Sequence, residues 1–248
     1  MKNNNSSIKT VVAVGIGAAL FFVLGRFVAI PSPVPNTNIS LQYAVLALLA
    51  AMYGPVVGGL IGFIGHALID LSWGGSPWWS WVIASAFTGV VVGLFAKKLN
   101  VQEGNFNKAK FAMFAVANLI AHAVAWIVVA PVLDILIYAE PVKKVFAQGA
   151  FAAISNIITA VVVGGLEAIV FCCVDMVEHS EPEFRLYSDV EEALYHVILL
   201  HRLAVGNEII AYLLGCCVGC FVRRFQEREY HYCKVAFKLF FRCLRHDG

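Results

Sequence analysis

The sequence predicts an all-α integral membrane protein: a bundle of six transmembrane helices followed by an atypical α-helical C-terminal extension. Between Thr10 and Ala96 only Arg26 and Asp70 carry a charge. A water-soluble domain of that length needs a charged surface, whereas a bilayer penalises every exposed ion. Hydrophobic residues make up 60% of the 248 residues and the mean hydropathy is +0.78, which leaves room for about six or seven spans. The formal net charge of +2 gives no reason to expect a nucleic-acid partner.

Apolar runs bounded by helix breakers define the six expected helices in order. The first ends before Pro31, and Gly54-Pro55 separates the second from the third. The loop SWGGSPWWSW, residues 72–81, precedes the fourth. The expected ranges are 10–30, 41–53, 56–71, the end of that loop to 95, 111–130 and 150–174.

Lysine placement predicts the orientation, because short cytoplasmic loops are enriched in basic residues. With a cytoplasmic N-terminus, six lysines lie inside and two lie outside. The inner six are Lys2, Lys9, Lys97, Lys98, Lys108 and Lys110, and the outer two are Lys143 and Lys144. The segment MKNNNSSIK has no small-residue cleavage site after it and is interpreted as a cytoplasmic leader. We therefore expect a multi-pass membrane protein with a cytoplasmic N-terminus.

Small residues recur four positions apart, a spacing that lets helix backbones approach closely in lipid. Internal packing is the simpler explanation, and docking against another membrane protein is the alternative for the first helix. The pairs and triplets are Ala13/Gly17, Gly15/Ala19, Gly54/Gly58/Gly62, Gly89/Gly93 and Ala117/Ala121/Ala125.

Scarce polar and aromatic side chains gather at the outer end of the expected bundle. A concave aromatic site with a few directional polar groups is how proteins hold flat, drug-sized molecules. The candidate substrate-binding residues are Asn38, Gln42, His66, Asp70, Trp73, Trp78, Trp79, Trp126 and Asn156. Simpler explanations exist for each: tryptophans anchor membrane proteins at the lipid interface, and His66 with Asp70 at four-residue spacing is often an internal hydrogen bond.

The sequence favours a binding protein without catalysis of its own and without a bound metal or cofactor. A His/Asp membrane metal carrier or enzyme is the alternative from a different class, using His66, Asp70 and His122. No HExxH pattern is present, and the expected helices supply few further ligands.

Three segments carry a resemblance to a known family. They are VVAVGIGAALFFVLGRFVAIPSPVPNTNISLQYAVLALLAAMYGPVVGGLIGFIGHALID, SWGGSPWWSWVIASAFTGVVVGLF and GAFAAISNIIT. Together they resemble the substrate-binding (S) component of an energy-coupling-factor (ECF) vitamin importer, in particular the riboflavin-type group. The resemblance covers about residues 1–162.

The resemblance implies a six-helix bundle in a bacterial cell membrane that captures a vitamin at its outer face. The implied ligand is riboflavin, and the same fold with thiamine or another small vitamin stays open. The implied partners are a transmembrane coupling subunit and two ATP-binding cassette ATPases, since this chain has no GxxxxGK[ST] loop. Small residues of the first helix form the family's docking surface, and Ala13, Gly17 and Ala18 match that position.

The C-terminal extension departs from this pattern. Residues 1–170 hold 14 charged side chains, and the remaining 78 residues hold 20. We expect a membrane domain at residues 1–174 and an atypical helical, Cys- and Arg-rich extension at 175–248, the product of a fusion or chimera. Its cysteines are expected to be reduced or acylated, and its helices to lie in the cytoplasm or at the lipid interface.

Overall fold

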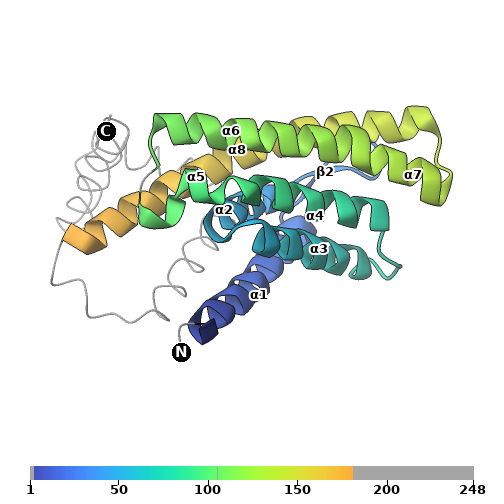
Figure 1. Cartoon of the computed structure of the whole chain (residues 1–248). Coiled ribbons are helices and arrows are strands. Elements are labelled where there is room, and N and C mark those ends of the chain that lie inside the picture. Colours follow the sequence, from blue (N-terminus) through green and yellow to red (C-terminus); the bar gives the residue numbers. More distant parts are fainter. Residues whose placement is uncertain (1–2, 105, 181–248) are drawn as a thin grey trace, which may run out of the picture. The chain divides into compact units, whose positions relative to one another are not determined.

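The computed structural model describes residues 3–104 and 106–180, which are almost entirely helical (Figure 1). Each of the six expected ranges lies on a helix of the structure. The first begins at residue 3 instead of 10, and the ends of the next three differ by one or two residues. The α-helices are α1 (Asn3–Phe27), α2 (Gln42–Tyr53), α3 (Pro55–Leu71), α4 (Trp79–Leu94), α5 (Ala96–Leu99), α6 (Lys108–Ala123), α7 (Ala130–Tyr138) and α8 (Val142–Ser180). A 3-10 turn, η1 (Val101–Glu103), and a π-helix, η2 (Val124–Val129), complete the helical elements.

The chain divides into two compact units, Met1–Ala168 and Ile169–Gly248. The first contains α1 to α7 and most of α8. Of the second, the structure describes residues 169–180, as the end of α8. The predicted linker, interfacial helices and clustered cysteines at residues 181–248 lie outside the described residues, and the predicted domain boundary at residue 174 stays a prediction.

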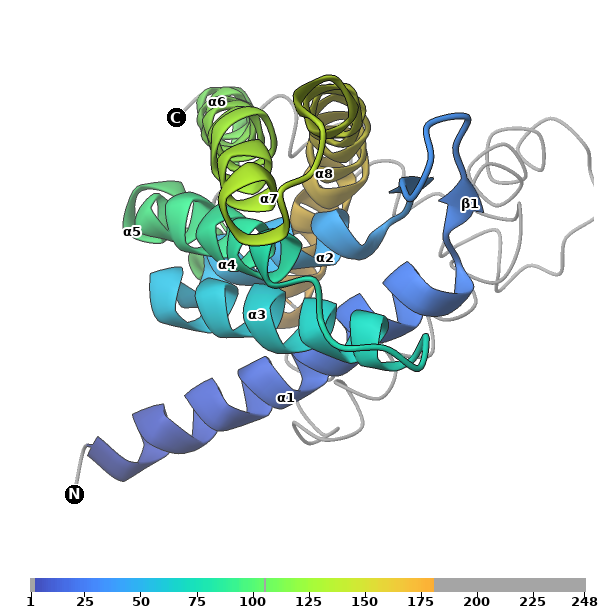
Figure 2. The ribbon, with the colours of Figure 1, turned by 90° about the vertical axis from the view of Figure 1, so that its right-hand side faces the viewer.

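Glycines bring α3 and α4 into backbone contact. A methyl group at Gly89 would lie 2.1 Å from the carbonyl oxygen of Gly58, and one at Gly62 would lie 2.4 Å from that of Ser85. At Gly93 it would lie 2.5 Å from the Pro55 backbone. The expected role of these glycines in internal packing is therefore confirmed. Figure 2 shows α3 between α1 and α4, with α6, α7 and α8 beyond α4.

The expected fifth helix runs further than predicted. It was expected to end at residue 130, but α6, η2 and α7 form one continuous span from Lys108 to Tyr138. Pro131 lacks the N–H that an α-helix would use at this point and its ring would crowd the preceding turn. The wider π-helix immediately before it lets the helix continue through the proline.

The sixth expected helix also differs at its start. α8 begins at Val142 instead of residue 150, so Lys143 and Lys144 lie in its first turn instead of in a loop. Gly149 on α8 faces the π-helix: a methyl group there would lie 2.0 Å from the carbonyl oxygen of Trp126. α8 and the π-helix are thus in close backbone contact.

By length and composition, the described residues include three helices able to cross a membrane. They are Ile8–Phe27, Lys108–Tyr138 and Val142–Cys172. A fourth is possible if α4 and the segment Ala96–Glu103, bent by 41°, act as one span. Because α2 and α3 have only 12 and 17 residues, the six-span count stays a prediction.

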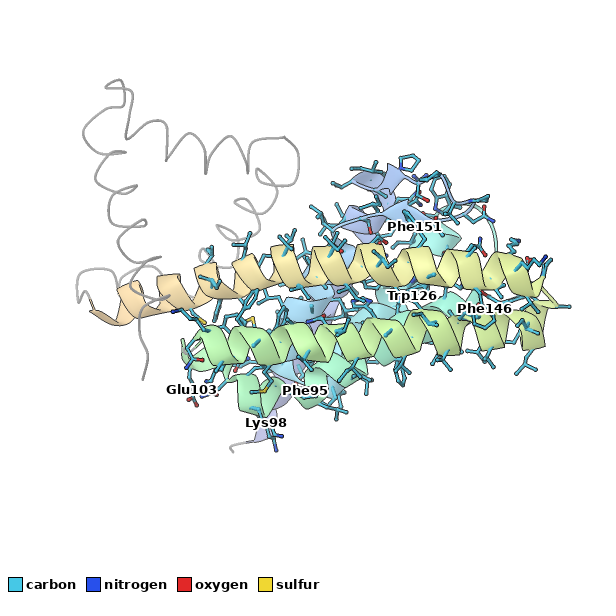
Figure 3. All side chains as sticks on the ribbon, turned by 90° about the horizontal axis from the view of Figure 1, so that it is seen from above. Phe95, Lys98, Glu103, Trp126, Phe146 and Phe151 are labelled. Atoms are coloured by element: carbon cyan, nitrogen blue, oxygen red, sulfur yellow. The ribbon has the colours of Figure 1, made fainter. Side chains whose placement is uncertain are left out.

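A short hairpin follows α1, where the sequence predicts no regular structure. β1 (Ile30–Pro31) pairs antiparallel with β2 (Asn38–Ile39). Gln148 of α8 donates its side-chain N–H to the carbonyl oxygen of Pro35 at 2.7 Å. The hairpin is therefore attached to the α7–α8 end of the bundle, whereas Lys98 and Glu103 lie at the opposite end (Figure 3).

Candidate functional site

A buried carboxylate, Asp134 of α7, holds the start of α4. Asp134 is 3% exposed. Its Oδ1 accepts a hydrogen bond from the indole N–H of Trp78 at 2.6 Å and another from the Ser80 hydroxyl. Its Oδ2 accepts one from the indole N–H of Trp81 at 3.0 Å. Three donors from one short segment offset the cost of burying this charge.

Sequence reasoning missed Asp134 because the expected fifth helix ended before it. The available signal was a single carboxylate inside the apolar run APVLDILIY. An ionisable residue within a membrane span is a functional candidate by default. Asp70 was predicted for this reason, whereas Asp134 lies beyond Pro131, where the helix was expected to have ended.

Trp78 is fixed by two carboxylates and a ring. Its backbone N–H donates to Asp70 Oδ2 at 2.8 Å, and its indole N–H donates to Asp134. The indole stacks on Tyr138 with ring centroids 3.9 Å apart, and the Tyr138 hydroxyl accepts the N–H of Trp79 at 2.9 Å. One face of the Trp78 ring is therefore covered by the protein itself.

A second hydrogen-bonded group joins α2, α3 and α4. The hydroxyl of Ser85 lies 2.6 Å from His66 Nδ1 and 2.8 Å from the hydroxyl of Tyr43. On its other side, His66 Nε2 lies 3.8 Å from Asp70 Oδ1. The expected proximity of His66 and Asp70, one turn apart on α3, is confirmed.

Trp126, on the π-helix, connects the two groups. It is 2% exposed. Trp81 meets it edge-on with centroids 5.5 Å apart, Tyr43 meets it edge-on at 5.8 Å, and His66 stacks on it at 6.4 Å. Tyr43 also meets His122 edge-on at 5.2 Å. The result is a buried aromatic cluster drawn from four separate helical segments.

A row of buried polar atoms lines this cluster. Asn118, His122 and Trp126 lie four residues apart, on one face of the α6–η2 helix, and we call them the inner row. Within the described part of the chain, Asn118 Oδ1, both ring nitrogens of His122 and Trp126 Nε1 have no hydrogen-bond partner. Each such group costs about 1–3 kcal/mol when buried. The arrangement can offer both donors and acceptors to a polar molecule beside aromatic rings.

Two of the remaining polar candidates are buried and one is exposed. Gln42 packs against α1, where a methyl group at Gly25 would lie 1.7 Å from Gln42 Oε1. Asn156 is 4% exposed on α8. Asn38 is exposed in β2, opposite Pro31.

Trp73 and Trp79 lie at the surface, outside the Trp126 cluster. Trp73 is 65% exposed and sits under the guanidinium of Arg26. Trp79 is 44% exposed and stacks on Phe63 at 6.1 Å. Of the predicted binding residues, the structure thus joins His66, Asp70, Trp78 and Trp126 in one network, and it places Trp73 and Trp79 at the surface. Their roles in binding stay predictions.

The predicted docking residues require a correction. Ala13 and Ala18 are buried, and a methyl group at Gly17 would lie 2.4 Å from Ile61 of α3. These residues pack inside the chain and do not form a surface. The open side of α1 is the neighbouring one, with Val11 71% exposed, Ile16 41% exposed and nothing within 4 Å of a methyl group at Gly15.

The alternative of a metal carrier gains no support from these positions. Across residues 3–104 and 106–180, no group of three or more His, Cys, Asp or Glu side chains could hold a metal ion.

Long apolar helices around an internal polar and aromatic cluster define a helical membrane protein with a candidate site for a small organic molecule. The chain belongs to the family described as the S component of the ECF-type riboflavin transporter, which it matches over residues 5–167. The predicted family membership is therefore confirmed.

Curated relatives share this region. A UPF0397 protein of Exiguobacterium sp. is 52% identical over 168 residues, which are 68% of this chain and 92% of that protein. A UPF0397 protein of Clostridium perfringens is 52% identical over 164 residues, 66% of this chain and 89% of its own length. One of Streptococcus agalactiae is 54% identical over 163 residues, 66% of this chain and 90% of its length.

The family assigns the chain to a membrane transporter as its S component, a class that is not enzymatic. The family match includes the whole inner row and Asp134, and it ends thirteen residues before the end of α8 at Ser180.

Proposed function

We propose that this chain captures riboflavin at the membrane for an ECF-type importer. The observation that carries the proposal is the inner row: buried donors and acceptors without partners, beside a cluster of aromatic rings. Family membership directs the choice of ligand class.

Riboflavin suits these groups chemically. Its flat ring system offers carbonyl oxygens, ring nitrogens and one N–H, and its ribityl chain offers hydroxyls. Trp126 Nε1 can donate to a carbonyl, while His122 and Asn118 can each accept from an N–H or a hydroxyl. Burial of an aromatic ring beside Trp126 and Tyr43 adds affinity through stacked or edge-on contacts.

The transport partners are part of the same proposal. A transmembrane coupling subunit and two ATP-binding cassette ATPases supply the energy, and the N-terminus lies in the cytoplasm. Docking uses the open side of α1, where small Gly15 and Ala19 lie among exposed apolar residues such as Val11 and Ile16. Close helix contact in lipid requires such small residues.

The full chain, purified in detergent after growth in rich medium, tests the ligand. We expect the absorption spectrum of a flavin at near-stoichiometric amount and tight binding of riboflavin to the stripped protein. Trp126→Phe keeps an aromatic ring but removes the indole N–H donor, and should weaken riboflavin binding about tenfold, or about 1.4 kcal/mol. Val128→Ala, on the same π-helix and 53% exposed, is the control and should leave affinity unchanged.

A colourless protein that does not bind riboflavin but binds thiamine would show that the proposed ligand is wrong and that the chain is still a vitamin-binding S component. Failure to bind either vitamin, with normal thermal unfolding, would overturn the proposed capture site.

A further inference from the structure

We infer that Asp134 is a positioning residue for the inner row: it sets the orientation of Trp81, and through Trp81 the orientation of Trp126. The inference rests on the proposed function for its effect on ligand affinity. Its effect on the tryptophans stands on the geometry alone.

Asp134 uses both carboxylate oxygens on one short segment. Trp78 and Ser80 share Oδ1, and Trp81 alone takes Oδ2. Trp78 directly precedes α4, and Ser80 and Trp81 lie in its first turn. All three donors are more than fifty positions away from Asp134 in the sequence. The carboxylate therefore fixes the rotation of this helix start as well as its position.

Joining two helices through a buried carboxylate costs free energy, because the charge loses its hydration. Neither of the two ion pairs found in the described part of the chain includes Asp134, so neutral N–H and O–H donors balance its charge. Apolar side chains of similar volume often pack two helices as well or better. The carboxylate additionally fixes the orientation of the three donor side chains, because each N–H or O–H must point at a particular oxygen.

Trp81 connects Asp134 to the candidate site. The Trp81 ring, held at its N–H by Asp134, meets Trp126 edge-on at an interplanar angle of 89°. Trp126 bears the unpartnered Nε1 of the inner row. A rotation of Trp81 would change the space beside Trp126, so Asp134 controls the site without belonging to it.

The same bonds restrict the loop between α3 and α4. Trp78 at the α4 end of this loop is held by Asp70 and Asp134. Towards α3 the loop contains Gly74 at φ +82° and the exposed Trp73. The bonds to Asp70 and Asp134 therefore fix the loop at its α4 end.

The test is the pair of substitutions Asp134→Asn and Trp81→Phe in the full chain. Asparagine keeps one acceptor oxygen for Trp78 and Ser80 but turns an amide N–H towards the N–H of Trp81. We expect D134N to weaken riboflavin binding about tenfold, and the double variant D134N/W81F to recover at least half of that loss on a logarithmic scale. Because Asp134 and Trp81 are in direct contact, the double-mutant cycle measures their coupling. Recovery by W81F would show that the loss of affinity in D134N acts through Trp81, and no recovery would show that it does not.

A ligand-independent readout separates this inference from the proposed function. In protein labelled with ¹⁵N-tryptophan, D134N should move the indole N–H signals of Trp78, Trp81 and also Trp126, which does not touch Asp134. The signal of Trp73, which contacts Arg26 and not the Asp134 segment, is the internal control. If riboflavin does not bind but the Trp126 signal moves, the proposed ligand is wrong and the positioning role of Asp134 is supported. An unmoved Trp126 signal, or D134N affinity equal to wild type, overturns the positioning role.

Discussion

The guanidinium carbon of Arg26 lies 3.7 Å from the ring centroid of Trp73. This contact joins the end of α1 to the loop between α3 and α4. Arg26 is the only charged residue between Thr10 and Asp70, and its aromatic partner Trp73 is 65% exposed. The contact therefore restrains the loop at the end of the bundle where the Asp70 and Asp134 network lies.

Removal of this contact should speed ligand exchange. A cation over an indole contributes about 0.5–2 kcal/mol, so Arg26→Gln should raise the dissociation rate of riboflavin between about twofold and thirtyfold. Stopped-flow fluorescence measures this rate. Arg26→Lys keeps the charge, and its dissociation rate should lie between those of the wild type and Arg26→Gln. Equal rates in all three proteins would show that the loop does not limit ligand exchange.

Replacement of an unpaired buried histidine should affect folding and binding in opposite directions. His122→Leu removes two buried nitrogens that have no partner in the described structure, so the ligand-free protein should become more resistant to heat while its affinity for riboflavin falls about tenfold. Thermal unfolding and equilibrium titration measure the two effects. His66→Leu is the matched control: His66 is bonded to Ser85, so its loss should lower stability. A lower melting temperature for His122→Leu would contradict the assignment of the inner row.

A methyl group at the α3–α4 contact should destabilise the bundle. At Gly89 it would lie 2.1 Å from the carbonyl oxygen of Gly58, a backbone atom that cannot move away alone. Gly89→Ala should therefore lower the melting temperature in detergent by several degrees. Gly75→Ala makes the same change in a loop, where nothing lies within 4 Å, and should have no effect. Similar melting temperatures for the two variants would refute the close packing.

The two sides of α1 should respond differently to a large residue. Gly15→Leu adds a side chain to the open side and should leave riboflavin binding intact while it weakens association with the coupling subunit. Gly17→Leu would push against Ile61 and Leu49 and should lower stability and affinity together. Co-purification with the coupling subunit, with ligand titration on the same samples, distinguishes them. Full association of Gly15→Leu would remove the open side of α1 as the docking surface.

The sequence predicted the helices well where breakers bound them. Gly54-Pro55 divides α2 from α3, and the loop with Trp73 divides α3 from α4, because these residues have strong local preferences. The role of glycines four apart in internal packing was also predicted, but the sequence did not show that α3 and α4 are the helices that meet. The family resemblance rested on the same segments.

Two features could not be found this way. α1 is apolar on every side, so no periodicity distinguishes the side that packs on Ile61 from the side that carries Gly15. Pro131 normally ends a helix, and the local sequence does not show that a π-helix would let the chain continue to Asp134. In both cases contacts between distant segments decide the outcome.

The π-helix has a further consequence for how this stretch can change. An α-helix advances by about 100° per residue, so deletion of one residue between Val124 and Val129 would turn Asn118 and His122 by that angle relative to Asp134. Substitutions in this stretch leave that angle intact, but a change in its length does not. The number of residues in this stretch therefore determines ligand recognition as much as their side chains do.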